Sequence, residues 1–249
     1  MGSSFPLHDG SGAALPGQLS MFPVLSRPAR AMVKVQEGAG SLLLFITPLL
    51  LPQSFASELS VVTCGSVLKL LNTKHNVRLH SHDVRYGSGS GQQSVTGVTA
   101  ADDGNSYWRI RGKSSTVCER GTLIKCGQAI RLTHVNTGRN LHSHHFTSPL
   151  SGNQEVSAFG EDGEGDILDD WTVVCNGEYW QRDEEVRFKH VSTNVLLSVT
   201  GEQYGRPING QREVHGMTYA SQHNYWKVME GIFMKPSESS RTDYTHSEL

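Results

Sequence analysis

The sequence of 249 residues predicts an all-β fold, and three observations lead to this prediction. A stretch of alternating apolar and polar residues occurs in three similar copies. Within each copy the apolar residues recur with a period of two, as expected for strands with one buried face. Turn-forming Gly, Asn, Pro and Ser residues separate these alternating stretches. No segment of ten or more residues has a convincing helical period.

Each copy contains three segments in the same order. The copies begin with a strand-like segment at residues 68–79, 130–141 and 186–197. After a glycine-rich turn, a second strand follows at residues 92–97, 153–158 and 211–216. Each copy closes on a tryptophan-led alternation at residues 107–110, 170–173 and 225–228. The same order in all three copies indicates an internal repeat.

The repeat predicts a β-trefoil, because one copy of this size buries too little apolar surface to be stable alone. Three copies can close around a pseudo-threefold axis as about twelve strands, with a barrel capped by hairpins. We expect this domain at residues 57–236, with repeats at about 61–113, 123–177 and 183–232. The residues expected at equivalent core positions are Leu79, Leu141, Leu197, Trp108, Trp171 and Trp226.

The N-terminal part of the chain predicts entry into the secretory pathway. The apolar run at residues 42–51 is too short to span a bilayer. Lys34 precedes the run, and the small residues Ser54 and Ala56 follow it, so we predict a signal peptide at residues 32–56. Residues 1–31 have no periodicity, and we expect a disordered extension, with Met32 as an alternative start.

The C-terminal end of the chain predicts the compartment. We expect residues 237–249 to form a flexible tail that ends in His246, Ser247, Glu248 and Leu249. This tetrapeptide resembles the Lys/His-Asp-Glu-Leu signals that return proteins to the endoplasmic reticulum, although Ser247 replaces the usual Asp. We therefore expect a protein of the endoplasmic reticulum lumen, partly secreted, that is not embedded in the membrane.

The four cysteines, Cys64, Cys118, Cys126 and Cys175, all follow the predicted signal peptide. An even number in a secreted chain indicates two disulfides, and three pairings are open from the sequence. In a trefoil, Cys64–Cys118 and Cys126–Cys175 bonds would each clasp one copy, and the third copy would have none. Zinc is the rival interpretation, but the chain has no Cys-x-x-Cys motif and the cysteine spacings do not fit a zinc finger.

Two copies contain the tetrapeptide Leu-His-Ser-His, which places His80 with His82, and His142 with His144, on one side of a strand. Two imidazoles could begin a zinc or copper site, but neither pair has a matching third ligand. The third copy has Leu197-Ser198-Val199-Thr200 instead, so the fold does not require the histidines. We expect no metal, and a polar contact surface or hydrogen-bonded turn, or else inherited repeat structure without function.

Composition and motifs exclude other classes of function. The formal net charge of −2 gives no electrostatic footprint for nucleic acid. The acidic segment at residues 161–170 lacks the spacing of a calcium loop, and we expect a solvated loop there. The Gly-x-Ser-x-Gly letters at 87–91 do not lie between a strand and a helix, so we assign no catalytic residue and no cofactor.

The triple unit with Leu-His-Ser-His and a closing tryptophan resembles the MIR repeat of protein O-mannosyltransferases and intracellular calcium-release channels. A chain with a signal peptide, three such repeats and a retrieval tail resembles the stromal cell-derived factor 2 family. The resemblance covers residues 61–236. It implies a non-enzymatic lumenal protein that associates with a J-domain co-chaperone and with the chaperone BiP, and binds unfolded or misfolded proteins.

The alternative function is a glycan-binding module for mannosylated proteins, because trefoils often present one sugar pocket per copy. Trefoil lectins of the ricin type have the motif Gln-x-Trp. The residues two positions before each tryptophan are here Ser106, Asp169 and Asn224. This difference weakens the lectin interpretation.

Overall fold

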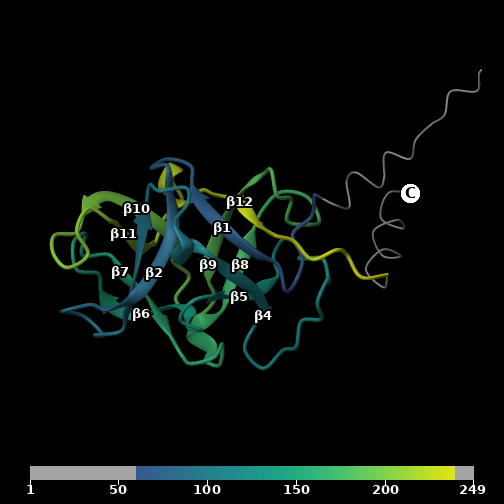
Figure 1. Cartoon of the computed structure of the whole chain (residues 1–249), viewed down its shortest axis with the longest axis horizontal. Coiled ribbons are helices and arrows are strands. Elements are labelled where there is room, and N and C mark those ends of the chain that lie inside the picture. Colours follow the sequence, from purple (N-terminus) through teal and green to yellow (C-terminus); the bar gives the residue numbers. More distant parts are fainter. Residues whose placement is uncertain (1–59, 239–249) are drawn as a thin grey trace, which may run out of the picture. The chain divides into compact units, whose positions relative to one another are not determined.

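The structure is a computed structural model that describes residues 60–238, drawn in colour in Figure 1. The predicted extension 1–31, the signal peptide 32–56 and the retrieval residues His246, Ser247, Glu248 and Leu249 lie outside the described residues. The described part of the chain is all-β, which confirms the predicted fold class.

Each copy of the repeat forms four strands, with a short 3-10 helix before the last one. The first copy contains β1 (Val67–Asn72), β2 (Val77–Arg85), β3 (Gln93–Val98), η1 (Gly104–Ser106) and β4 (Trp108–Gly112). The second contains β5 (Ala129–His134), β6 (Asn140–Thr147), β7 (Gln154–Phe159), η2 (Ile167–Asp169) and β8 (Trp171–Val174). The third contains β9 (Glu185–His190), β10 (Leu196–Gln203), β11 (Arg212–Met217), η3 (Gln222–Asn224) and β12 (Trp226–Ile232).

The first and last strands of the three copies close into a barrel. Strand β1 pairs with β4, β4 with β5, β5 with β8, β8 with β9, β9 with β12, and β12 with β1. Every pairing is antiparallel, so the ring has no free edge among these strands. The two middle strands of each copy form the hairpins β2–β3, β6–β7 and β10–β11. The hairpins join one another through β3–β7, β7–β11 and β11–β3 (Figure 1). A closed barrel with three linked hairpins is a β-trefoil.

The core is built from equivalent residues of the three copies. Trp108, Trp171 and Trp226 are each 0% exposed. The equivalent leucines of the three copies, Leu79, Leu141 and Leu197, are also 0% exposed. Each indole Nε1 donates a hydrogen bond of 2.9 Å to the backbone oxygen of one of these leucines, in the pairs Trp108–Leu79, Trp171–Leu141 and Trp226–Leu197. These bonds satisfy the polar atom of a buried tryptophan and tie the last strand of a copy to its hairpin.

Hydrogen bonds between copies repeat with the same symmetry. The Asn72 side chain donates to the backbone oxygen of His223, at 2.8 Å. His134 and His190 occupy the same position in the second and third copies. Their Nε2 atoms lie 2.9 Å from the backbone oxygen of Asn105 and 2.8 Å from that of Leu168. The end of each first strand therefore bonds the 3-10 helix of the preceding copy.

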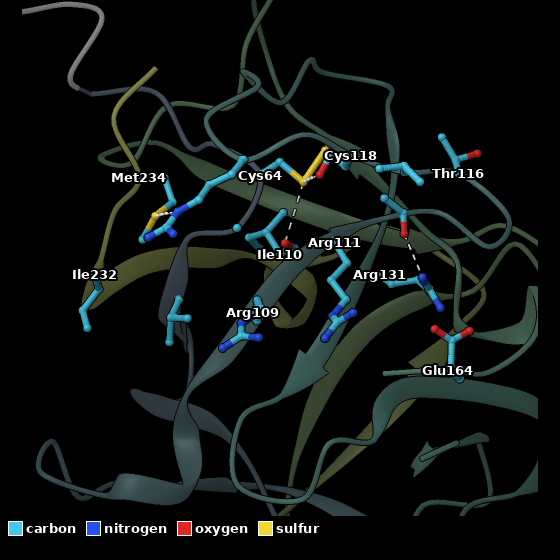
Figure 2. Close-up of a pocket in the computed structure, with 15 residues that line it drawn as sticks. Cys64, Arg109, Ile110, Arg111, Thr116, Cys118, Arg131, Glu164, Ile232 and Met234 are labelled. Atoms are coloured by element: carbon cyan, nitrogen blue, oxygen red, sulfur yellow. Dashed lines mark hydrogen bonds between the residues drawn. A yellow bond between two sulfur atoms is a disulfide. The ribbon is translucent and has the colours of Figure 1, made fainter. Parts of the chain in front are cut away.

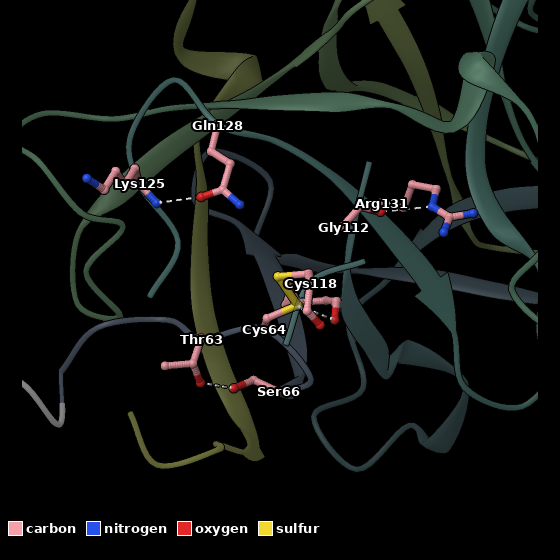
Figure 3. The surroundings of a disulfide bond; sticks show 9 residues. Thr63, Cys64, Ser66, Gly112, Cys118, Lys125, Gln128 and Arg131 are labelled. Atoms are coloured by element: carbon pink, nitrogen blue, oxygen red, sulfur yellow. Dashed lines mark hydrogen bonds between the residues drawn. A yellow bond between two sulfur atoms is a disulfide. The ribbon is translucent and has the colours of Figure 1, made fainter. Parts of the chain in front are cut away.

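Two disulfides each close one copy. Cys64 pairs with Cys118 and Cys126 with Cys175, with Cα atoms 6.1 and 5.3 Å apart. This is the pairing that the trefoil predicts. Figure 3 shows the first bond beside the Thr63–Ser66 hydrogen bond at the start of the copy. The bond ties the loop of residues 113–120, which follows β4, to the turn that precedes β1, and we call this loop the wall of the pocket described below.

Candidate functional site

The first Leu-His-Ser-His segment lies in β2, where its first histidine is buried. His80 is 4% exposed, although the sequence predicts an exposed contact position. Its Nδ1 lies 2.8 Å from the Asp103 carboxylate beside η1, and its Nε2 lies 2.7 Å from Nδ1 of His82. The expectation of an exposed surface is therefore wrong for His80, because η1 packs over the outward side of β2.

Two groups of this first cluster, Asp103 and His82, have pKa values below their ordinary values. Burial raises the pKa of Asp103, but hydrogen bonds from Ser106 and His80 outweigh it and hold the pKa below its ordinary value. Burial, followed by the neighbouring His80, lowers the pKa of the half-buried His82. The cluster thus combines an ionised carboxylate with a neutral His82 near neutral pH.

The second segment lies in β6, and its first histidine is also buried. His142 is 2% exposed, and its Nδ1 lies 2.8 Å from Asp169, which is 0% exposed. His144 is half-buried, with Nε2 3.1 Å from the carboxylate of the buried Glu155. The predicted contact surface is therefore also wrong for His142. Asp169 belongs to the acidic segment that the sequence predicts as a solvated loop, and its burial corrects that prediction too.

The third copy shows what replaces a histidine at this position. Ser198 occupies it, and the Asn224 side chain donates a hydrogen bond of 2.7 Å to the serine hydroxyl. Both residues are 0% exposed. Each copy therefore has a polar pair that joins its hairpin strand to its 3-10 helix: His80–Asp103, His142–Asp169 and Ser198–Asn224. The histidines are optional, but the polar contact is present three times.

One group in the described residues has the composition of a cation site. The ligand atoms of His142, Asp166 and Asp169 all lie within 4.8 Å of one another. However, Asp166 accepts a hydrogen bond from the Leu168 amide at 2.8 Å, and Asp169 accepts one from the Asp166 amide at 2.9 Å. These bonds form the capping box of η2, which accounts for the cluster without an ion.

A pocket lies beside the Cys64–Cys118 disulfide, over β4 and β5 (Figure 2). Its volume is about 700 Å³. Its lining contains the disulfide, exposed aliphatic side chains, one carboxylate from Glu164, and the arginines Arg109, Arg111, Arg120 and Arg131. We call this pocket the arginine groove. Its surplus of guanidinium groups gives it the charge expected of a candidate site for anionic groups.

The strand register explains why these arginines meet. Arg109 and Arg111 flank Ile110, which is 0% exposed, so both point away from the core. Arg131 lies directly opposite Arg111 on β5. Its guanidinium donates to the backbone oxygens of Gly112 and Gly163, both at 2.9 Å, and is thereby fixed. Figure 2 shows Arg109, Arg111 and Arg131 in a row, with Glu164 near Arg131.

The sequence pattern does not single out the residues of these sites. Asp103 and Asp169 stand in different positions of their 3-10 segments, so the repeat alignment does not pair them. The only signal is that Asp169, like Asn224, precedes its tryptophan by two positions. Arg109 and Arg111 show only that they alternate with core residues, which indicates exposure and not proximity to Arg131.

The position of the tryptophans weakens the lectin interpretation further. Sugar-binding aromatics stack an exposed ring on the sugar, but Trp108, Trp171 and Trp226 are 0% exposed and bond to backbone oxygens of the core. A fourth tryptophan, Trp180, is also 0% exposed.

The fold and the groove define a class of protein. The chain contains a disulfide-clasped β-trefoil of three repeats, with a cationic groove between the first and second copies. Across residues 60–238, no helix is both long and apolar enough to cross a membrane.

Comparisons with known proteins agree with this class. The MIR domain family matches residues 69–174. Human stromal cell-derived factor 2 is 83% identical over 194 residues, which cover 78% of this chain and 92% of the human protein. The crystal structure of the SDF2-like protein from Arabidopsis thaliana is 43% identical, with a TM-score of 0.69, and covers 72% of this chain and 99% of that one.

Part of a longer chain is also similar. The S. cerevisiae protein O-mannosyltransferase Pmt1–Pmt2 complex bound to the sugar donor gives a TM-score of 0.62 at 26% identity. The match covers 76% of this chain and 29% of that one. The chain described here belongs to the stromal cell-derived factor 2 family of MIR-domain proteins.

Proposed function

We propose that this protein is a non-enzymatic adaptor of the endoplasmic reticulum lumen. It associates with a J-domain co-chaperone and, through it, with the chaperone BiP. The complex binds misfolded proteins and holds them for folding or quality control. The adaptor contributes binding area and no chemical step.

The observation that carries this proposal is the composition of the arginine groove. Its lining combines guanidinium groups with Val117, which is 90% exposed, and Ile232, which is 68% exposed. Arginine and aliphatic side chains together are suited to contact with a polypeptide, because they offer charge, directed hydrogen bonds and apolar area. The disulfide-held wall keeps this surface formed before a partner arrives.

The polar clusters of the repeats support the same function. His142 and Asp169 are engaged with each other and with the η2 cap, and His80 is engaged with Asp103. These groups have structural partners in every copy. Groups that could perform acid–base chemistry are thus used to join strands to helices.

The compartment is supported by covalent structure and by sequence. Two disulfides that each close about fifty residues, with separations of 54 and 49, suit an oxidising lumen. The predicted signal peptide at 32–56 provides entry, and the tail that ends in Glu248 and Leu249 provides retrieval.

Affinity capture tests the proposal. The tagged protein is expressed in the endoplasmic reticulum and recovered from lysate, and the bound proteins are identified by mass spectrometry with and without mannose in the wash. A lumenal protein with the same tag and the same C-terminal tetrapeptide is the control. We expect a J-domain co-chaperone and BiP in the first sample only, with unchanged yield in mannose. Loss of both proteins in mannose, or equal recovery by the control, contradicts the adaptor function.

A further inference from the structure

The arginine groove brings four guanidinium groups together, with Glu164 as the one carboxylate in its lining. Arg111 and Arg131 are direct cross-strand partners, and Arg109 lies on the same face of β4 as Arg111. Like charges in such positions destabilise a sheet. Burial, followed by Arg109 and Arg131, lowers the pKa of the Arg111 guanidinium. An anionic group between these side chains would relieve the repulsion.

Arg111 also has an unused donor. Its Nε is buried and has no hydrogen-bond partner within the described residues. Ion pairs found among residues 60–238 include neither Arg109 nor Arg111. A buried N–H group without a partner is uncommon in proteins, and this one belongs to a side chain that lines an open groove. A carboxylate can accept from Nε and from the guanidinium end at once.

The two other copies show that the trefoil does not need these arginines. The positions of Arg109 and Arg111, counted from the closing tryptophan, are occupied by Thr172 and Val174 in the second copy. In the third copy they are occupied by Lys227 and Met229. Strands β8 and β12 nevertheless form the same barrel pairings as β4. The arginine pair is therefore a feature of one copy and not a requirement of the fold.

The apolar side of the groove lies next to the arginines in the same sheet. Val67 on β1 is the register partner of both Arg109 on β4 and Ile232 on β12. Val117 stands in the wall that the Cys64–Cys118 disulfide holds in place. A ligand that reaches the arginines therefore also meets exposed aliphatic carbon.

We propose that the arginine groove binds an extended acidic peptide segment of a partner protein. Carboxylates at two alternate positions of the peptide bond Arg109 and Arg111. Apolar side chains further along the same side of the peptide contact Val117 and Ile232. The spacing fits, because residues i and i+2 of an extended chain are about 6.8 Å apart in the peptide just as they are in β4. A sulfated glycan shares the negative charge but has no apolar side chain for Val117 and Ile232, so the lining favours a peptide.

Fluorescence anisotropy with the purified protein tests this inference. The probe, called the alternating peptide, is the fluorescein-labelled octapeptide Leu-Ser-Glu-Ser-Glu-Ser-Leu-Ser, in which leucine and glutamate occupy alternate positions and therefore one side of the extended chain. A second labelled octapeptide has the same composition with its glutamates grouped at one end. We expect saturable binding of the alternating peptide that weakens as salt is raised, and at least roughly fivefold weaker binding of the grouped peptide.

The other copies of the repeat provide the variants. R109T with R111V installs the residues of the second copy, so the barrel is expected to remain folded, which circular dichroism checks. This variant should bind the alternating peptide at least about tenfold more weakly, because two charge-assisted contacts are lost. R111K keeps the charge but loses the planar fork, and should give an intermediate loss. K227T removes the equivalent cation of the third copy and should change nothing.

Three results would overturn the inference. The first is unchanged affinity of the R109T/R111V variant for the alternating peptide, and the second is equal affinity of the protein for the grouped peptide. The third is more efficient displacement of the probe by heparan sulfate than by unlabelled peptide. This inference rests on the proposed function, whose supporting surface is the same groove. Failure here with successful capture from lysate removes the groove as the contact surface, and the adaptor function then stands on the captured proteins. Binding of the peptide without capture of a J-domain co-chaperone and BiP removes the adaptor function and leaves the groove as a peptide site.

Discussion

Removal of the Asp169 carboxylate should destabilise the second repeat strongly. Asp169 is 0% exposed and has three partners: the His142 ring at 2.8 Å, the Asp166 amide at 2.9 Å and the Asn140 amide group at 3.1 Å. The substitution D169A leaves the His142 ring and the Asp166 amide without this acceptor, and the Asn140 amide group keeps only its bond to the Gly163 backbone oxygen at 3.2 Å. Each buried unsatisfied group costs about 1–3 kcal/mol, and compensation by water is partial, so we expect a loss of about 3–5 kcal/mol in the free energy of unfolding.

The third copy offers a replacement that separates pair coupling from simple damage. H142S with D169N installs the Ser198–Asn224 pair in the second copy. Each single substitution should cost about 2 kcal/mol, because it mismatches one partner. The double variant should cost less than the sum by about 1–2 kcal/mol. The exposed His145 on the same strand provides the control H145S, which should stay within about 0.5 kcal/mol of the parent.

Urea denaturation followed by tryptophan fluorescence measures all five variants, with the disulfides intact. Additive losses in H142S and D169N would show that the two side chains do not act as a pair. A loss below about 1 kcal/mol in D169A would refute the claim that the buried carboxylate organises η2 and β6.

Three further predictions concern pH, covalent bonds and retention. Burial lowers the pKa of His134 to about 4, so the unfolded chain binds the proton more readily. The contribution of this group to the free energy of unfolding is complete above pH 6.5 and falls by about 3 kcal/mol toward pH 4. The variant H134N carries asparagine, the residue found at the equivalent position Asn72 of the first copy. Urea titrations of this variant should lack the pH-dependent contribution. Replacement of Cys126 and Cys175 by serine opens a loop with a separation of 49 residues. The chain-entropy relation predicts a loss of about 4 kcal/mol in the free energy of unfolding, and an unchanged urea midpoint would contradict this prediction. Deletion of Glu248 and Leu249 should shift the protein from cells to medium on immunoblots; full retention would show that partner binding holds it in the lumen.

The sequence was sufficient for the fold because the repeat supplies its own comparison. Trp108, Trp171 and Trp226 stand in equivalent positions, and a residue that recurs at the end of each alternating stretch must face a shared core. The same closure brings the ends of a copy together, which explains why Cys64 meets Cys118. Both conclusions depend on period and order, and these are visible in the chain.

The state of the histidines was not predictable from the same pattern. Alternation places His80 on the opposite side of β2 from Leu79, but it does not say what lies there. In the structure η1, more than twenty residues later in the chain, covers that side and supplies Asp103. A short 3-10 segment without apolar periodicity gives no signal, so the sequence suggests a solvated face.

The arginine groove was hidden for a different reason. Arg109 and Arg111 belong to the first copy, whereas Arg131 and Glu164 belong to the second. Only the β4–β5 pairing, which joins two copies, brings them together. Alignment of the repeats compares equivalent positions, so it does not reveal contacts between positions that are not equivalent.

The central claim is that this trefoil acts by binding a chaperone system. The most direct measurement is sedimentation velocity of the purified protein with a purified endoplasmic reticulum J-domain co-chaperone, with and without mannose. We predict a complex that forms at micromolar concentration and is unaffected by the sugar. Independent sedimentation of the two proteins, or a complex that mannose dissolves, would contradict the claim.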